Sequence, residues 1–188
     1  MKRFAISLLC FIFFAAMPAF SYNVNHFTDD FVISDALELL KSTNANEVFD
    51  NLEENSVRIM FYDLSLISYS YRDHYAINGY NNMGDRCILI NTKYRNAPKE
   101  EIACLIAHES CHKAKVATLE EETLATQTEA KYWLLLKHKG VLYQNDDLTQ
   151  RLNNLAYLYK TSTPSKNNIE TRIANSPFYR DQLALKND

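Results

Sequence analysis

Two histidines and a glutamate stand close together in the run HESCH, residues 108–112. His108 and His112 are four residues apart, so in a helix both imidazoles project from the same face, about one turn apart. That spacing lets two ring nitrogens meet a single tetrahedral Zn²⁺ ion. Glu109 points slightly away from this face, where its carboxylate can reach a water at the metal without being a ligand. The run therefore predicts a metal site with a carboxylate beside it.

The H-E-x-x-H pattern of His108, Glu109 and His112 follows the uncharged residues Leu105–Ala107 and resembles the zinc-binding motif of the zincin superfamily of metallopeptidases. The resemblance covers residues 87–133 and identifies no narrower family. It implies a zinc cofactor held by both histidines, with Glu109 as the general base. It also implies a small zincin-like fold in which the histidine helix follows a short β-sheet. The alternative is an ordinary helix that carries two surface histidines.

A zinc site of this kind needs a third protein ligand, and the residues after His112 limit where it can come from. Metzincins continue the motif as H-E-x-x-H-x-x-G-x-x-H, but Lys115 and Thr118 stand where the glycine and the third histidine would be. The resemblance is therefore to the thermolysin-like class, which takes a glutamate from the following helix. The stretch TLEEETLATQTEA, residues 118–130, supplies several glutamates.

Glu122 is the glutamate that we expect to complete the set of ligands. Thr118 and Glu121 form a T-x-x-E capping box, which occupies Glu121 at the start of the helix. Glu122 lies on a helical stripe with Ala125 and Glu129, and the small Ala125 lets this helix approach the histidine helix. Glu121 and Glu129 remain alternative ligands. Glu129 also resembles the acid with which zincins orient a ligating histidine through its other ring nitrogen; otherwise it is a solvated helix carboxylate.

The resemblance implies a hydrolytic mechanism. Two neutral imidazoles and a carboxylate would hold Zn²⁺ and leave a fourth position for water, whose pKa the metal lowers toward ~7. Glu109 would take the proton from this water as it attacks a peptide carbonyl, and would then pass it to the leaving amine. The donor that stabilises the oxyanion stays open, and the candidates are His74, Tyr75, Tyr80 and Tyr157.

The elements that position these residues can be traced along the chain from hydrophobic spacing, cap residues and β-branched or aromatic runs. The expected elements are helices at 29–41 and 44–55, a strand at 57–65, a hairpin or irregular strand within 67–86, a buried strand at 87–91, and helices at 96–115, 118–138 and 146–160. Helices, then a small sheet, then helices indicate the α+β class, in one small and mainly helical domain. The strand at 87–91 could pair with an extended peptide substrate.

The first residues predict export. Lys2 and Arg3 precede an uncharged apolar run, Phe4–Ala16, and Pro18 is followed by small residues in an A-x-S pattern that ends at Ser21. This is the pattern of a secretory signal peptide cleaved after Ser21, and the apolar run is shorter than a transmembrane helix requires. An uncleaved membrane anchor is the alternative. We therefore expect a secreted or periplasmic protein without a stable membrane span after cleavage.

The chain divides into three expected parts: a signal peptide at 1–21, a zincin-like metallopeptidase domain at 22–160, and a polar C-terminal tail at 161–188. Loss of Lys2 and Arg3 with the signal peptide changes the formal net charge from −3 to −5. No basic patch with interleaved aromatic residues occurs, so we expect no nucleic-acid partner.

The mature chain keeps three cysteines, Cys87, Cys104 and Cys111, which are too few for a disulfide scaffold. Cys104 and Cys111 are seven residues apart on one expected helix, about 10 Å along its axis, which is beyond the reach of a disulfide. Any disulfide would therefore include Cys87, and at least one thiol stays free or pairs outside the chain.

The leading interpretation is a secreted zinc-dependent metallopeptidase that hydrolyses peptide or protein substrates. The alternative is a noncatalytic zinc-binding or interaction module in which the metal fixes two helices. A third interpretation is an exported helical protein without metal. The first two both require bound zinc, and only the first requires Glu109 for peptide cleavage.

Overall fold

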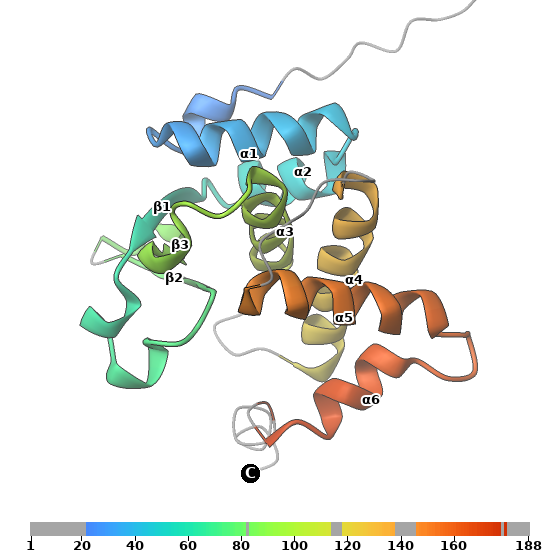
Figure 1. Ribbon diagram of the computed structural model, residues 1–188. Coiled ribbons are helices and arrows are strands. Elements are labelled where there is room, and N and C mark those ends of the chain that lie inside the picture. Colours follow the sequence, from blue (N-terminus) through green and yellow to red (C-terminus); the bar gives the residue numbers. More distant parts are fainter. Residues whose placement is uncertain (1–21, 82, 114–117, 138–145, 178, 180–188) are drawn as a thin grey trace, which may run out of the picture.

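The computed structural model describes residues 22–81, 83–113, 118–137, 146–177 and 179 of the chain. In Figure 1 a small sheet lies beside a set of helices, and α1 crosses above α3 while α5 crosses below. The helices are α1 (Phe31–Ser42), α2 (Asn46–Glu54), α3 (Lys99–Ser110), α4 (Leu119–Leu136), α5 (Asp147–Thr161) and α6 (Asn168–Ala174), and the strands are β1 (Arg58–Tyr62), β2 (Ala76–Tyr80) and β3 (Arg86–Asn91). Short 3₁₀ helices lie at Val24–His26, Leu64–Leu66, Tyr69–Tyr71 and Thr92–Tyr94. This mixture of helices and a small sheet confirms the α+β class.

The three strands form one sheet in the order β1-β3-β2. β1 runs parallel to β3, with Ile59 opposite Ile88, and β2 runs antiparallel to β3, with Asn78 opposite Ile88. Ile88 and Ile90 have no exposed surface, because β3 is flanked on both sides and covered by helices.

Two expectations about the strands are wrong. The strand expected at 57–65 ends at Tyr62, because the Asp63 carboxylate accepts the N–H of Ser65 at 3.0 Å and starts a 3₁₀ turn. The strand at 87–91 is the central strand of the sheet, paired with β1 on one side and β2 on the other, so its backbone is not available to a peptide substrate. The edge strand nearest to the histidines is β2.

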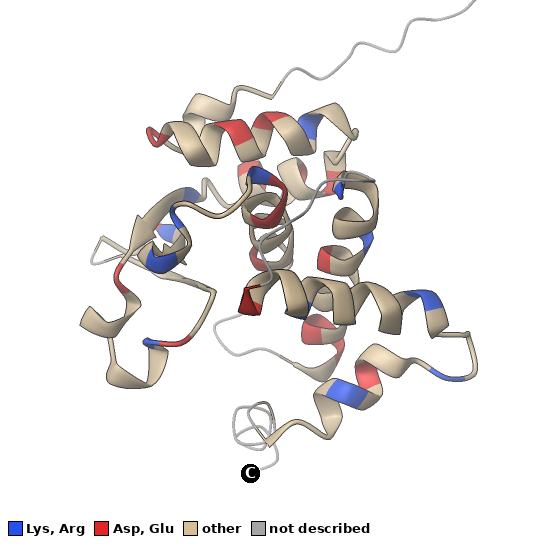
Figure 2. Cartoon of the chain, in the orientation of Figure 1, with Lys and Arg blue, Asp and Glu red and all other residues tan. Residues whose placement is uncertain are grey.

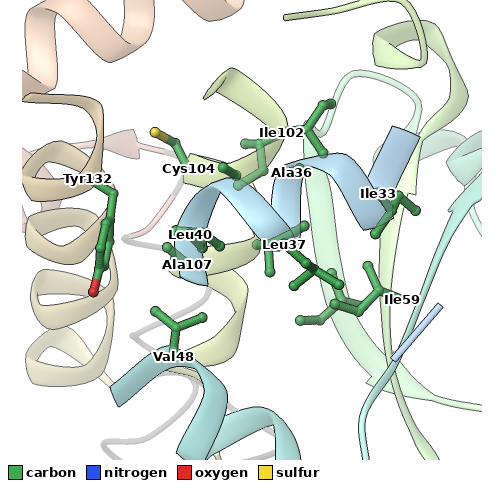
Figure 3. Packing of buried hydrophobic residues seen from close by; sticks show 14 of the residues in the cluster. Ile33, Ala36, Leu37, Leu40, Val48, Ile59, Ile102, Cys104, Ala107 and Tyr132 are labelled. Carbon is green, nitrogen blue, oxygen red and sulfur yellow. The ribbon is translucent and has the colours of Figure 1, made fainter. Parts of the chain in front are cut away.

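α3 is the central helix of the fold and is enclosed on all sides. Every residue in Glu100–Ser110 is buried, whereas a surface helix would have one polar face. Figure 3 shows how Leu37 of α1, Val48 of α2 and Tyr132 of α4 surround Ala107 of α3. The last turn of α3 therefore carries its side chains into the interior of the protein.

Side-chain caps set the starts of the two helices that follow α3. Thr118 Oγ1 accepts the backbone N–H of Glu121 at 3.1 Å, as the capping box predicts. Asp146 caps α5 by accepting the N–H of Thr149 at 2.8 Å. α3 itself begins directly after Pro98, without a side-chain cap.

The structure differs from the polar tail that the sequence predicts for residues 161–188. This segment contains α6, and its two isoleucines, Ile169 and Ile173, are buried in a cluster with Ala130 of α4 and Leu155 of α5. The isoleucines are four residues apart, so they share one face of the helix. Ile169 and Ile173 are the only large apolar residues of Asn168–Ala174, which is a weak helix signal, and the helix is instead stabilised by its packing against α4 and α5.

The three cysteines Cys87, Cys104 and Cys111 are buried free thiols. Within the described ranges no helix combines the length and apolarity of a membrane-crossing segment. The expected signal peptide at 1–21 and the expected end of a helix at His138 lie outside the described residues, so both stay predictions.

Acidic positions occur on α3, on α4 and at the start of α5 (Figure 2). Glu101 of α3 has no exposed surface; its Oε1 accepts a hydrogen bond from Thr149, and its Oε2 is buried without a partner. Burial raises the pKa of Glu101 to about 7, although the Thr149 hydrogen bond opposes this rise. Glu101 is therefore costly to ionise in the folded protein.

Replacing Glu101 by glutamine should stabilise the protein at high pH. The folded pKa lies above the ordinary value of 4.5, so stability is fully present below pH 4.5 and falls as pH rises toward 7. Glu101→Gln removes this ionisation and should raise the free energy of unfolding by about 1–3 kcal/mol at pH 8, with little effect at pH 4. Urea unfolding at both pH values measures the difference. The exposed Glu120→Gln serves as the control, and an equal effect of Glu101→Gln at both pH values would contradict the explanation.

Substitution of Ile173 tests whether α6 is part of the core. Ile173→Ala deletes a buried side chain that packs on α4 and α5 and should lower the free energy of unfolding by about 2–4 kcal/mol. The exposed Glu170→Ala on the same helix should change it by less than about 1 kcal/mol. Equal and small losses for both variants would show that α6 does not pack as described.

Candidate metal centre

The last turn of α3 carries His108 and Glu109, and His112 follows just beyond it. The helix expected to run further ends at Ser110, with Cys111 as its C-cap. The N–H of His112 still donates to the Glu109 carbonyl at 3.3 Å, so a tightened turn continues the helical path. The centroids of the two imidazole rings lie 5.2 Å apart. The i, i+4 spacing therefore brings the rings together even though the helix is shorter than predicted.

Two side chains from other elements explain why α3 stops here. In a longer helix the N–H of Lys113 would donate to the Glu109 carbonyl. Instead it donates to the carboxylate of Glu121 at 2.5 Å, and the Glu109 carbonyl accepts from Asn78 Nδ2 of β2 at 2.8 Å. Contacts to α4 and β2 thus fix the end of α3 and, with it, the position of His112.

Glu122, in the first turn of α4, faces both histidines. Its Oε2 lies 3.9 Å from Nε2 of His108, and its Oε1 lies 3.6 Å from Nε2 of His112. One ligand atom from each of the three residues lies within 4.8 Å of the other two. Each residue has less than a tenth of its surface exposed, at 7% for His108, 9% for His112 and 6% for Glu122. These three side chains form a group that could hold a metal ion.

The donor atoms fit a small cation. Ligands about 2.0 Å from a tetrahedral ion are about 3.3 Å from one another. The two oxygens of Glu122 each lie close to this distance from one Nε2 atom, at 3.9 Å for His108 and 3.6 Å for His112. Oε2 of Glu122 is buried without a hydrogen-bond partner, which is costly unless a cation compensates it. Burial, together with the nearby His108 and Arg86, lowers the pKa of His112 to about 3. The His112 imidazole is therefore neutral, which is the form that ligates a metal.

The two alternative ligands approach the other nitrogen of each ring. Oε1 of Glu121 is 3.9 Å from Nδ1 of His112, and Oε2 of Glu129 is 3.0 Å from Nδ1 of His108. Both carboxylates therefore lie on the side of a ring that faces away from Glu122. Neither carboxylate therefore belongs to the group of His108, His112 and Glu122 that could hold an ion.

Glu129 is itself held by Arg151 of α5. The guanidinium contacts both carboxylate oxygens, with Nη2 2.7 Å from Oε2. Burial alone would raise the pKa of Glu129, but Arg151 and His108 outweigh burial and hold this pKa below its ordinary value. Glu129 therefore remains a carboxylate. Oε2 of Glu129 lies 3.0 Å from Nδ1 of His108, and this carboxylate helps to raise the pKa of His108 against the effect of burial.

Glu109 lies beside the three-residue group without belonging to it. Only 8% of its surface is exposed. Burial raises the pKa of Glu109 to about 7; the nearby His108 opposes this rise, and the carboxylates of Glu122 and Glu129 add to it. A carboxylate with a pKa near neutrality can both accept and release a proton under ordinary conditions.

A cavity of about 750 Å³ lies between β2 and the C-terminal helices. His108 and Glu109 form part of its wall, together with Ala76 of β2, Arg151 of α5 and Ile173 of α6. The general-base candidate and one of the candidate metal ligands are thus accessible from this cavity.

Two of the four candidate oxyanion donors line the cavity, and the other two do not. His74 and Tyr75 line the cavity beside His108 and Glu109. Tyr80 and Tyr157 are largely exposed, at 48% and 68%, and do not line this cavity.

Two residues of the site were not found from the sequence. Arg151 was expected only as part of the helix at 146–160, and Tyr179 lies in the segment expected to be a polar tail. Tyr179 lines the cavity and hydrogen-bonds to Glu122, which partly offsets the rise in the pKa of Glu122 caused by burial. Neither position has a spacing signal, because each contacts a residue far away in the sequence.

No family model matches the chain, and comparison with curated proteins and with solved structures gives no match either. The resemblance to the zincins therefore rests on the motif formed by His108, Glu109 and His112. The case for a metal centre rests on the geometry of His108, His112 and Glu122.

Glu122 is the ligand whose removal tests the centre most directly. We expect the wild-type protein, purified without chelator, to hold one zinc ion per chain. Glu122→Ala should weaken zinc binding by more than about 100-fold, because losing a ligand costs more than losing an outer partner of a ligand. Elemental analysis and chelator competition measure this. Glu120→Ala, exposed in the same helical turn, should bind zinc normally, and unchanged binding by Glu122→Ala would exclude this ligand set.

Proposed function

We propose that this chain is an exported zinc-dependent metallopeptidase, secreted or periplasmic, that hydrolyses peptide bonds. The observation that carries the proposal is the position of Glu109. Its buried carboxylate adjoins the group of His108, His112 and Glu122 and lines the same cavity as His108. Export is inferred from the signal-peptide pattern of residues 1–21.

The donor set favours zinc over other divalent cations. Two imidazole nitrogens and one carboxylate oxygen suit Zn²⁺, whereas Mg²⁺ and Ca²⁺ prefer oxygen ligands only. Three protein ligands with a fourth position left open are the arrangement of catalytic zinc sites. When bound there, zinc supplies a Lewis acid that polarises a carbonyl and lowers the pKa of water.

Glu109 has the properties of the base in this reaction. It accepts the proton of the attacking water and delivers it to the leaving amine, which requires a carboxyl group that changes protonation state readily. Its pKa of about 7, raised by burial, suits both steps. Asn78 holds the Glu109 carbonyl at 2.8 Å and so links this residue to β2.

A peptide is the substrate class that the surroundings favour. β2 is an edge strand, and it lies against the last turn of α3 through the Asn78–Glu109 contact. An extended peptide that pairs with such an edge is aligned by main-chain hydrogen bonds. Ala76 of β2 lines the cavity together with His74 and Tyr75, so a peptide along β2 would pass beside possible donors for the oxyanion.

One observation favours the noncatalytic alternative. Glu122 belongs to α4, whereas His108 and His112 belong to the end of α3, so a bound ion would cross-link two buried helices. Such a cross-link stabilises a fold whether or not any reaction follows. Substitution of Glu109, which lies outside the ligand group, distinguishes the two functions.

Glu109→Gln should abolish peptide hydrolysis and leave the metal in place. Because glutamine cannot take a proton from water, the rate should fall by about 10²–10⁴-fold, while zinc content and the circular dichroism spectrum stay unchanged. Cleavage of an unstructured protein or a peptide library, followed by mass spectrometry, measures the activity. Glu120→Gln is the matched control and should retain full activity. A zinc-loaded wild-type protein that cleaves none of these substrates would support the noncatalytic module.

A further inference from the structure

Arg151 of α5 is a nearly buried cation whose two terminal nitrogens are both used by one carboxylate. Nη2 lies 2.7 Å from Oε2 of Glu129, and Nη1 contacts Oε1. The side chain of Arg151 is 18% exposed, and that of Glu129 has no exposed surface. This bidentate pair fixes both the position and the plane of the Glu129 carboxylate.

The same oxygen that Nη2 contacts also faces a metal-ligand candidate. Oε2 of Glu129 is 3.0 Å from Nδ1 of His108, while Nε2 of His108 faces Glu122. A continuous chain of contacts therefore runs from Arg151 of α5 through Glu129 of α4 to His108 of α3. It ends where His108 faces Glu122, at the candidate metal position. Within this chain Arg151 touches neither the ligand atoms nor the position of the ion.

We propose that Arg151 is a positioning residue for His108 and acts through Glu129; this inference rests on the proposed zinc site. By clamping the carboxylate, Arg151 keeps Oε2 opposite Nδ1 of His108. The Nδ1 atom then carries the ring proton, and the lone pair of Nε2 points toward Glu122 and the ion. Arg151 thus sets the tautomer and the direction of one ligand without binding the metal.

The surroundings of Arg151 favour arginine in particular. Its guanidinium lies over the ring of Tyr75, with the central carbon 4.9 Å from the ring centroid. The planar group is therefore held by an aromatic ring as well as by the carboxylate fork of Glu129. Lysine would keep the charge but could not reproduce the planar, two-point contact.

Zinc affinity, measured by chelator competition at fixed pH, tests this role without depending on activity. Arg151→Met should weaken zinc binding by about 10–100-fold, as for other partners that orient a metal ligand. Arg151→Lys should lose part of this affinity. Arg172, an exposed arginine on the wall of the same cavity, provides the control, because Arg172→Met removes the same charge without touching Glu129. It should bind zinc as tightly as the wild type.

A double-mutant cycle tests whether Arg151 acts through Glu129. If it does, adding Arg151→Met to Glu129→Gln causes little further loss of zinc affinity. Additive losses would overturn the inference, as would equal losses in Arg151→Met and Arg172→Met. If Arg151→Met does not fold, Arg151→Lys decides: reduced affinity with a normal melting temperature supports the role, and wild-type affinity overturns it.

The proposed function and this inference fail in different ways. A wild-type protein that binds no zinc removes the proposed function and the inference together. A wild-type protein that binds zinc tightly, with equal affinity in Arg151→Met, removes only the role of Arg151.

Discussion

Burial of ionisable side chains around the last turn of α3 is the constraint on which the site depends. Charged groups removed from water destabilise a fold unless each one is paired or neutralised. Here His108, Glu109, Glu122 and Glu129 are all buried, and the carboxylates of Glu122 and Glu129 lie 3.9 and 3.0 Å from the His108 ring nitrogens. Only one permanent cation, Arg151, contacts this group among the described residues, and Glu129 uses both of its terminal nitrogens. The remaining negative charge lies on the Glu122 side of the histidines, where a divalent cation would balance it.

The sequence predicted the parts of this arrangement that depend on local spacing. The four-residue separation of His108 and His112 predicted adjacent rings, and the capping box predicted the start of α4. With that start fixed, the position of Glu122 on its helical stripe follows from the helical period. These features are set by neighbours within one or two turns, which is the range over which helical periodicity carries information.

The parts that the sequence did not predict depend on contacts between distant residues. α3 ends at Ser110 because Asn78, 31 residues earlier than Glu109, takes the Glu109 carbonyl. Arg151 reaches Glu129 across 22 residues, and Tyr179 reaches Glu122 from the segment expected to be a tail. No hydrophobic period marks such polar contacts, because their partners are decided only when the helices pack together.

The two sides of the candidate centre are unequal, and this bears on the choice between a structural and a catalytic ion. A structural zinc site is closed by four protein ligands, whereas the described part of the chain brings together three, His108, His112 and Glu122. On the far side, the Glu129 carboxylate, which the Arg151 guanidinium holds, faces Nδ1 of His108. On the near side, Glu109 and the cavity adjoin the group without closing it. An ion bound here would be held on one side and open on the other, beside a carboxyl group with a pKa of about 7, which is the asymmetry that the proposed hydrolysis requires and that a purely structural ion does not.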